Sequence, residues 1–284
     1  MSRKAFTLIE LLVVISIIGM LSSIAIVSTS GSRDKARLAA TQSFAAQLFR
    51  TLGSDIVAQY DFEEGSGTAA SDTSGNGNNG TLVGSPAWST DTPYAGSRYS
   101  LNFGGSSYVE TARGFGVGST NFTIATWVKT SSANSQMYFV ANSGSDWFRF
   151  GLSGGQLMFL LGSVGFTEVS CGTQRINDGK WHHVAGSFSR TSLMFKCYID
   201  GSLAGSATLG GSYTATGTTV VRIGTTYCCS SFAGLLDDIR VYAEDTSGVS
   251  FDPKNMILAR DAERSGKSEP ANHPRRQDLV IKFD

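Results

Sequence analysis

Charged residues are scarce in this sequence, and their signs cancel. Only 16% of the residues are charged, and 23 acidic side chains balance 23 basic ones. Binding to the phosphate backbone of a nucleic acid needs a basic excess, which this chain lacks. We therefore expect no nucleic-acid partner.

Cysteine is also rare, and its spacing argues against a zinc site. The four cysteines are Cys171, Cys197, Cys228 and Cys229, and no two of them form a C-x-x-C pair. Disulfides become available if the domain is exported. Because Cys228 and Cys229 are adjacent, we do not expect them to bond to each other. A bond from one of them to Cys171 or to Cys197 is the candidate arrangement, and the spacing leaves the partner open.

The residue patterns of several catalytic sites are missing as well. No E-x-D-x-x-E run places two carboxylates on one strand face, as glycoside hydrolysis requires. Glu63 and Glu64 precede a glycine and predict a turn, while His182 and His183 would point to opposite faces of a strand. No G-x-S-x-G nucleophile motif is present. We do not expect an enzyme.

The first 32 residues contain the most informative pattern. A short basic leader precedes an apolar run from Phe6 to Val27, and no charge lies between Leu11 and Ser32. As a helix, the uncharged stretch spans about 33 Å, enough to cross a hydrocarbon core of about 30 Å. A cleaved secretory signal peptide would share the basic start and the apolar run, with Ser23–Ala25 as its small-residue cleavage site.

Glu10 separates these two interpretations. A carboxylate is costly to bury unpaired in an apolar segment, and neither a signal peptide nor a plain anchor needs one. The segment K-A-F-T-L-I-E-L-L resembles the processing motif of type IV pilins and pseudopilins. The resemblance implies that a prepilin peptidase cuts between Ala5 and Phe6 and that Phe6 is N-methylated. It also implies that Glu10 pairs with the terminal amine of a neighbouring subunit. The family usually has glycine before the cut, where this chain has Ala5.

The same resemblance implies a location and partners. The chain would be a single-pass protein of the bacterial inner membrane with a periplasmic or extracellular head, and would join other pilin or pseudopilin subunits in a pilus or pseudopilus. Apolar residues recur at every fourth position from Ala40 to Leu52, so we expect the helix to continue and pack against the head, with Gly53 as its stop. The expected parts are a leader (1–5), a helix (6–53, with 6–27 in the membrane), a sandwich (54–243) and a polar tail of no assigned function (244–284).

The pattern of the head is that of β-strands. Short apolar and aromatic runs alternate with Gly, Ser, Asn and Thr, and about a dozen short strands predict a two-sheet jelly roll. The segments YDFEEGSGTAASDTSGNGNNGTLVG, WHHVAGSF and GLLDDIRVY resemble the laminin-G-like, concanavalin A-like domain of bacterial surface proteins. The expected fold is mainly β, with a long transmembrane and amphipathic helix before the sandwich. The clearest strands are Phe122–Lys129, Trp147–Leu152, Trp181–Phe188, Leu193–Asp200 and Gly234–Tyr242.

A calcium site follows from the laminin-G-like resemblance. Many members of that group hold one calcium ion between the S-G-N-G-N loop and an acid on a late strand, and calcium favours such oxygen ligands. The matching residues are Asp72, Asn76 and Asn78, with Asp237 or Asp238. Because adjacent strand residues point to opposite faces, at most one of the two late acids should be a ligand. The alternative is that the Asn-Gly repeats only form tight turns and that one acid of the pair faces water.

Glycan binding is a second candidate activity of the head. Trp88, Tyr94, Trp147 and Tyr213 could stack on sugar rings if they lie at loop tips, whereas Trp127 and Trp181 lie inside predicted strands and are structural. We expect the head to bind a glycan or a surface protein. The alternative function for the whole chain is an exported carbohydrate-binding or adhesion module with a simple signal or anchor.

Overall fold

A computed structural model describes residues 7–116, 120–142, 147–163, 165–209, 219–225 and 231–246. Within these ranges, the side chains of residues 23–30, 147 and 163–168 are not described. The chain divides into two compact units, Met1–Phe251 and Asp252–Asp284, and the second lies outside the described residues.

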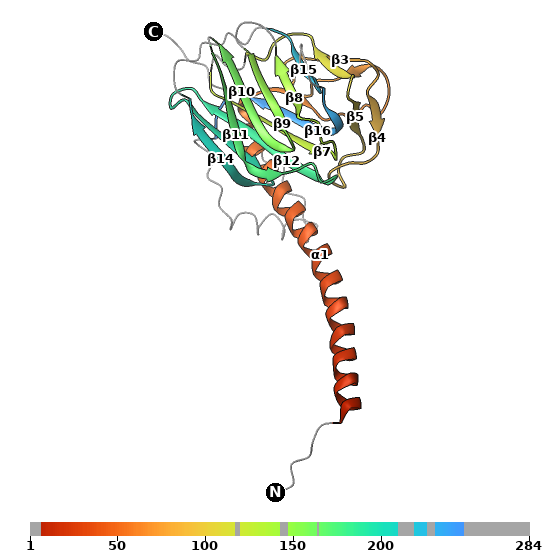
Figure 1. Cartoon of the computed structure of the whole chain (residues 1–284). Helices are drawn as coiled ribbons and strands as arrows, with labels where there is room; N and C mark the ends of the chain where they lie inside the picture. The colour runs from red at the N-terminus through yellow and green to blue at the C-terminus, as the bar shows by residue number, and fades with distance from the viewer. Residues whose placement is uncertain are drawn as a thin grey trace, which may run out of the picture. The chain divides into compact units, whose positions relative to one another are not determined.

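Helix α1 runs without interruption from Leu8 to Leu52 (Figure 1). It begins with a capping box, in which the Thr7 hydroxyl accepts from the Glu10 backbone N–H (3.3 Å) and the Glu10 carboxylate accepts from the Thr7 N–H (2.8 Å). A 3-10 turn, Gly53–Asp55, follows directly, so the helix ends next to the predicted stop.

The expected membrane segment, residues 6–27, reaches beyond the described part of the chain. Phe6 lies outside it, as do the side chains of residues 23–27. Among the residues that are described, no helical stretch has the length and apolar character needed to cross a bilayer.

The head is a sandwich of two antiparallel sheets, as the sequence predicts (Figure 1). Sheet A has the order β14-β13-β12-β7-β16-β5-β4, with β1 also paired to β16, and sheet B has the order β11-β10-β9-β8-β15-β6-β3-β2. The strands of sheet A are β1 (Ile56–Tyr60), β4 (Ala87–Ser89), β5 (Ser100–Gly104), β7 (Phe122–Lys129), β12 (Trp181–Ser189), β13 (Met194–Ile199), β14 (Ser202–Thr208) and β16 (Ala233–Tyr242). Those of sheet B are β2 (Ala69–Ala70), β3 (Gly80–Val83), β6 (Tyr108–Thr111), β8 (Gln136–Asn142), β9 (Trp147–Ser153), β10 (Gln156–Ser163), β11 (Gly165–Arg175) and β15 (Val221–Ile223).

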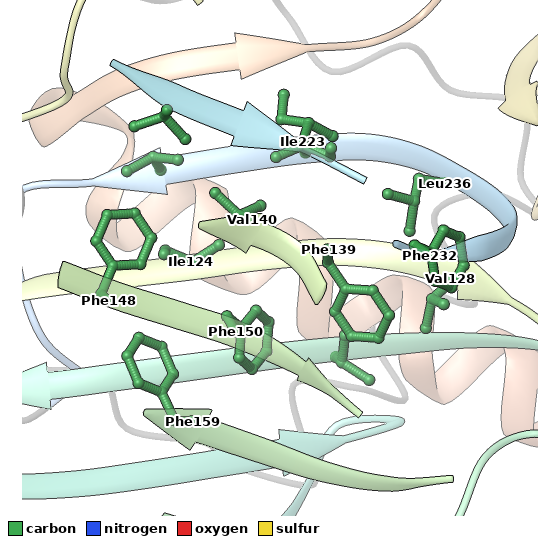
Figure 2. Close-up of a cluster of buried hydrophobic side chains, with 14 of the residues drawn as sticks. Ile124, Val128, Phe139, Val140, Phe148, Phe150, Phe159, Ile223, Phe232 and Leu236 are labelled. Carbon is green, nitrogen blue, oxygen red and sulfur yellow. The ribbon is translucent and has the colours of Figure 1, made fainter. Parts of the chain in front are cut away.

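The core between the sheets is rich in phenylalanine. Figure 2 shows Phe148 and Phe150 of β9 and Phe159 of β10 side by side, and all three are buried. Gly186 lies opposite them on β12, where a Cβ atom would come within 2.9 Å of the Phe150 and Phe159 rings. A side chain at position 186 would therefore push the two sheets apart.

A disulfide joins the two sheets at one side of the sandwich. Cys171 of β11 is bonded to Cys197 of β13, with 5.4 Å between their Cα atoms. Both side chains are fully buried in the core. The candidate pairing of Cys228 or Cys229 with one of these residues is therefore wrong, because Cys171 and Cys197 point toward each other across the core. Cys228 and Cys229 lie outside the described residues.

The head continues a few residues beyond its predicted end. Asp245 and Thr246, expected at the start of the tail, are buried. The Thr246 N–H donates to the Ser187 hydroxyl (2.9 Å), and the Thr246 hydroxyl is 3.0 Å from that of Tyr198. The rest of the predicted tail, residues 247–284, lies outside the described residues.

Candidate functional site

The C-terminal third of α1 packs on the outer face of sheet A. Phe44, Leu48 and Leu52 are almost fully buried there, as the four-residue spacing predicts. The Phe44 ring centroid lies 5.4 Å from that of Tyr198. We call this contact the helix–head joint; its other members are Ala125, Ala185, Tyr198 and Tyr242.

The hairpin turn between β13 and β14 forms the polar side of the joint. One oxygen of Asp200 accepts a hydrogen bond from the Arg37 guanidinium (2.7 Å) and lies 2.8 Å from Nδ1 of His182. The other oxygen accepts from the His183 backbone N–H (3.1 Å). Burial acts to raise the pKa of Asp200, but its contacts with His182 and Arg37 outweigh burial and lower it. Asp200 thus stays charged and holds Arg37.

Two further features fix the position of the helix. Gly201, with φ +81°, follows Asp200, and a Cβ atom on it would lie 3.0 Å from the Cβ of Phe44. Near the other end of the joint, Lys180 lies 3.3 Å from Asp34 of α1. Burial, helped by the charge of Arg240, lowers the pKa of His183 to about 3, so the His183 ring is neutral at neutral pH.

Of the three predicted processing and assembly residues, the structure describes one. Ala5 and Phe6 lie outside the described residues. Glu10 is exposed in the first turn of α1, where its carboxylate accepts from the hydroxyl (2.7 Å) and the backbone N–H of Thr7. Its carboxylate therefore lies at the amino end of the helix, beside Thr7, the second residue after the predicted cleavage site.

The loop half of the predicted calcium site is a hydrogen-bonded turn. Oδ1 of Asp72 accepts from the backbone N–H groups of Gln59 and Ser74 (3.0 Å each), and Oδ2 accepts from that of Asn78 (2.8 Å). Burial acts to raise the pKa of Asp72, but these bonds and one with the Ser74 side chain outweigh it and lower the pKa. The carboxylate already satisfies several N–H donors.

The two asparagines of this loop anchor it to β1. The Asn76 amide donates to the Ile56 carbonyl (2.8 Å), and the Asn78 amide donates to the Val57 carbonyl (2.8 Å). Over the described ranges, no three His, Cys, Asp or Glu side chains form a group that could hold a metal. The predicted ligand set also includes the two asparagines Asn76 and Asn78, to which that finding does not apply, and calcium binding stays a prediction.

Asp237 and Asp238 depart from the expected alternation of a strand. A bulge in the pairing of β16 with β7 falls between Asp237 and Arg240, and Asp238 has φ +47°. Both carboxylates are consequently buried, so the expectation that one of them faces water is wrong. Asp237 accepts from the Ser97 hydroxyl (2.8 Å), and Asp238 accepts from the Arg240 guanidinium (2.7 Å).

The buried Asp237 carboxyl makes the stability of the head depend on pH. Burial, helped by the charges of Asp238 and Glu63, raises the pKa of Asp237 to about 8. The folded state then keeps a proton that the unfolded chain releases above pH of about 4, so this contribution to stability is lost as pH rises toward 8. We expect Asp237→Asn to raise the free energy of unfolding at pH 8 by about 2 kcal/mol or more. Urea unfolding at pH 4 and at pH 8 measures this, and an equal effect at both values would contradict it.

The same titration tests the calcium prediction. If calcium binds the Asp237 carboxylate, adding it at pH 8 stabilises the wild-type chain and not the Asp237→Asn variant, because only the wild type has the anionic ligand. Equal stabilisation of the two chains would remove Asp237 from the ligand set.

Of the four predicted aromatic residues, the structure describes the side chains of Trp88 and Tyr94, and neither lies at an open loop tip. Trp88 lies in β4, packs against the core and donates from Nε1 to the Gly67 carbonyl (3.3 Å). Tyr94 is half-buried, with its ring centroid 5.9 Å from that of Trp127. The Trp147 side chain and all of Tyr213 lie outside the described residues.

Two family models match this chain. The model of the prokaryotic N-terminal methylation motif matches residues 1–26. The model of the concanavalin A-like lectin/glucanases superfamily matches residues 103–247, just over half of the chain. This chain belongs to the concanavalin A-like lectin/glucanases superfamily. The methylation motif on this superfamily member implies a prepilin anchored in the inner membrane, with an extracytoplasmic domain and the pilin assembly machinery as partner.

Solved structures share the fold of this concanavalin A-like head. Domain 4 of the extracellular arabinanase AbnA from Geobacillus stearothermophilus, in complex with arabinotriose, has a TM-score of 0.56 at 21% identity, over 72% of this chain and 97% of that domain. The binding domain of Paraclostridial Mosquitocidal Protein 1 has a TM-score of 0.56 at 14% identity, over 73% of this chain and 52% of that one. The binding domain of botulinum neurotoxin DC, in complex with rat synaptotagmin II, has a TM-score of 0.54 at 13% identity, over 74% and 52%. The chain thus spans about half of each toxin domain. A comparison with curated protein sequences found no match to this chain.

Proposed function

We propose that this chain is a type IV pilin-like or pseudopilin subunit that displays a concanavalin A-like head on a pilus or a secretion pseudopilus. A prepilin peptidase removes residues 1–5, Phe6 is methylated, and Glu10 pairs with the terminal amine of a neighbouring subunit as it leaves the inner membrane. In an apolar bundle each of these charges is tolerated only with its partner, so the pair sets the axial register of the subunits.

One observation carries this proposal. The methylation motif lies at the start of a helix that runs unbroken from Leu8 to Leu52 and is packed against the head through the helix–head joint. A removable signal peptide needs no such continuity, because it is separated from the mature domain by cleavage. A filament subunit does need it, since the helix that assembles must also carry the head.

For the head we propose adhesion through a glycan or a protein, and no catalysis. Its fold is shared by an arabinanase domain in complex with arabinotriose and by a toxin domain in complex with a protein. Neither likeness identifies the ligand, because a fold hosts many functions. An exported binding module with a simple anchor is the alternative, and the mature N-terminus separates the two: methylated Phe6 supports the filament, and a start near Ile26 supports the module.

The assembly role rests on the charge of Glu10. We expect Glu10→Gln and Glu10→Ala to insert into the membrane and be cleaved normally, but to enter filaments at least about a hundredfold less, because an unpaired buried charge costs about 3–5 kcal/mol. Immunoblots of sheared filaments and of membranes measure the two fractions.

Thr7→Ala is the matched control for this experiment. It removes the hydroxyl of the capping box and leaves the charge of Glu10 in place. Loss of a cap costs only about 1 kcal/mol, so filament entry should largely persist. Normal entry of Glu10→Gln would disprove the proposed pairing.

A further inference from the structure

An open groove lies on the outer face of sheet A, beside the helix–head joint. Asn102 of β5, Leu235 of β16 and Lys129 of β7 form a cross-strand row along it. Ser131 and Ser132, from the segment after β7, line its rim. The volume is about 490 Å³, within the range of about 300–1,000 Å³ usual for small-molecule sites. No α1 residue lines the groove, so docking of the helix leaves it open.

The polar groups of the groove include two that are available to a ligand. Within the described residues, neither the Asn102 amide nor the Ser131 hydroxyl has a hydrogen-bond partner. Thr130, by contrast, donates to the Ala233 carbonyl (2.7 Å), and the Ser132 hydroxyl accepts from the Asn134 N–H (3.3 Å). An amide and a hydroxyl together offer donors and acceptors, which suits a ligand rich in hydroxyl groups.

The charge of the groove is neutralised from within the head. Lys129 is the charged residue of the lining, and its ammonium lies 2.5 Å from the Asp91 carboxylate. The other oxygen of Asp91 accepts from Trp181 Nε1 (2.8 Å), so the carboxylate is fixed in place. An anionic ligand would have to compete with Asp91 for Lys129, whereas a neutral ligand would not.

The floor of the groove is apolar and rigid. Leu235 supplies hydrocarbon surface between the polar groups, whereas the Phe103 side chain points into the core from the other face of β5. At Gly234, φ is +147°, and a Cβ atom would lie 2.4 Å from the Lys129 carbonyl oxygen. The strands therefore approach each other too closely there for a side chain. A sugar ring has faces of C–H groups and edges that carry hydroxyl groups. Apolar surface suits the C–H face, and the flanking donors and acceptors suit the hydroxyl groups.

We propose that this groove binds one sugar unit of a neutral oligosaccharide, through the Asn102 amide and the Ser131 hydroxyl. The proposal deepens the adhesive role given to the head above and rests on it. It assigns recognition to hydrogen bonds on sheet A, in place of the aromatic stacking that the sequence suggested.

The test uses the full chain in mild detergent on an array of neutral and uronate-bearing oligosaccharides. We expect at least one neutral oligosaccharide to bind, and Asn102→Trp and Ser131→Trp each to abolish that binding by filling the groove. Ser135→Trp, in the same segment but outside the lining, is the matched control and should bind normally. With the oligosaccharide that binds best, Asn102→Ala and Ser131→Ala should each raise Kd by about three- to tenfold, the effect of one neutral hydrogen bond.

The other outcomes overturn the proposal. These are binding to no oligosaccharide, binding to uronates alone, or binding that survives both tryptophan variants. Filament entry is measured on the same variants and should be unchanged, because neither residue belongs to α1 or to the joint. A chain that enters filaments but binds no sugar would refute the groove alone, and a chain that binds sugar but never enters filaments would refute the subunit role alone.

Discussion

Replacing Cys171 and Cys197 together by alanine should lower the free energy of unfolding of the head by about 3–4 kcal/mol. The bond closes a loop over a sequence separation of 26 residues, and the loop-closure entropy of such a loop gives a loss of this size. The effect should be visible in urea unfolding of the full chain in mild detergent, followed by tryptophan fluorescence. A reducing agent should shift the unfolding of the wild-type chain in the same direction.

The remaining cysteines supply the control. Cys228→Ala combined with Cys229→Ala should leave the free energy of unfolding within about 0.5 kcal/mol of wild type, because neither residue belongs to the disulfide. If that pair of changes were the costly one, the pairing first suggested by the sequence would be right and the bond between β11 and β13 would be wrong. The result also bears on location, because a head that depends on this bond folds fully only in an oxidising compartment.

The strands of the head could be placed from the sequence because the burial of strand faces produces apolar runs and alternating apolar residues that are visible within a few residues. The run Phe122–Lys129 coincides with β7, and the alternating Phe195, Cys197 and Ile199 are buried as predicted. That alternation already put Cys197 in the core. Only the partner of Cys197 was missing, because the arrangement of strands that brings β11 next to β13 is set by contacts between distant parts of the chain.

The two late aspartates show where a local rule fails. Strict alternation would turn one of Asp237 and Asp238 toward water, but the bulge in β16 buries both. The residues D-D-I-R do not predict a bulge, because a bulge depends on the register with the neighbouring strand. The raised pKa of Asp237 was therefore not predictable either.

The helix–head joint was half predictable. The apolar stripe from Ala40 to Leu52 shows that α1 packs against something, because its period is that of a helix. It does not show against what. The ion pair of Arg37 with Asp200 joins residues 163 positions apart, and an Asp-Gly pair such as Asp200-Gly201 is in itself only the usual sequence of a hairpin turn. The groove beside the joint left no sequence signal, since it depends on three strands being neighbours.

Leu48→Ala should release the C-terminal part of α1 from the head. Leu48 is 1% exposed, and truncating a buried leucine costs about 2–5 kcal/mol. The sandwich has its own core between the sheets, so we expect the loss to appear as local opening of α1. Amide hydrogen exchange over residues 37–52 should quicken by about 30-fold or more, the factor that corresponds to about 2 kcal/mol, while the amides of β7 keep their protection.

Leu203→Ala is the matched control, because it makes the same chemical change on the head at a side chain that is 58% exposed. Its exchange should equal that of the wild type. Three results distinguish the ways in which the joint could act. Faster exchange in α1 alone means that the joint opens as a separate unit while the sandwich stays folded. Faster exchange in both α1 and β7 means that helix and sandwich unfold together. Unchanged exchange in α1 would mean that the buried contact of Leu48 does not hold the helix, and the role given to Leu48 in the joint would be wrong.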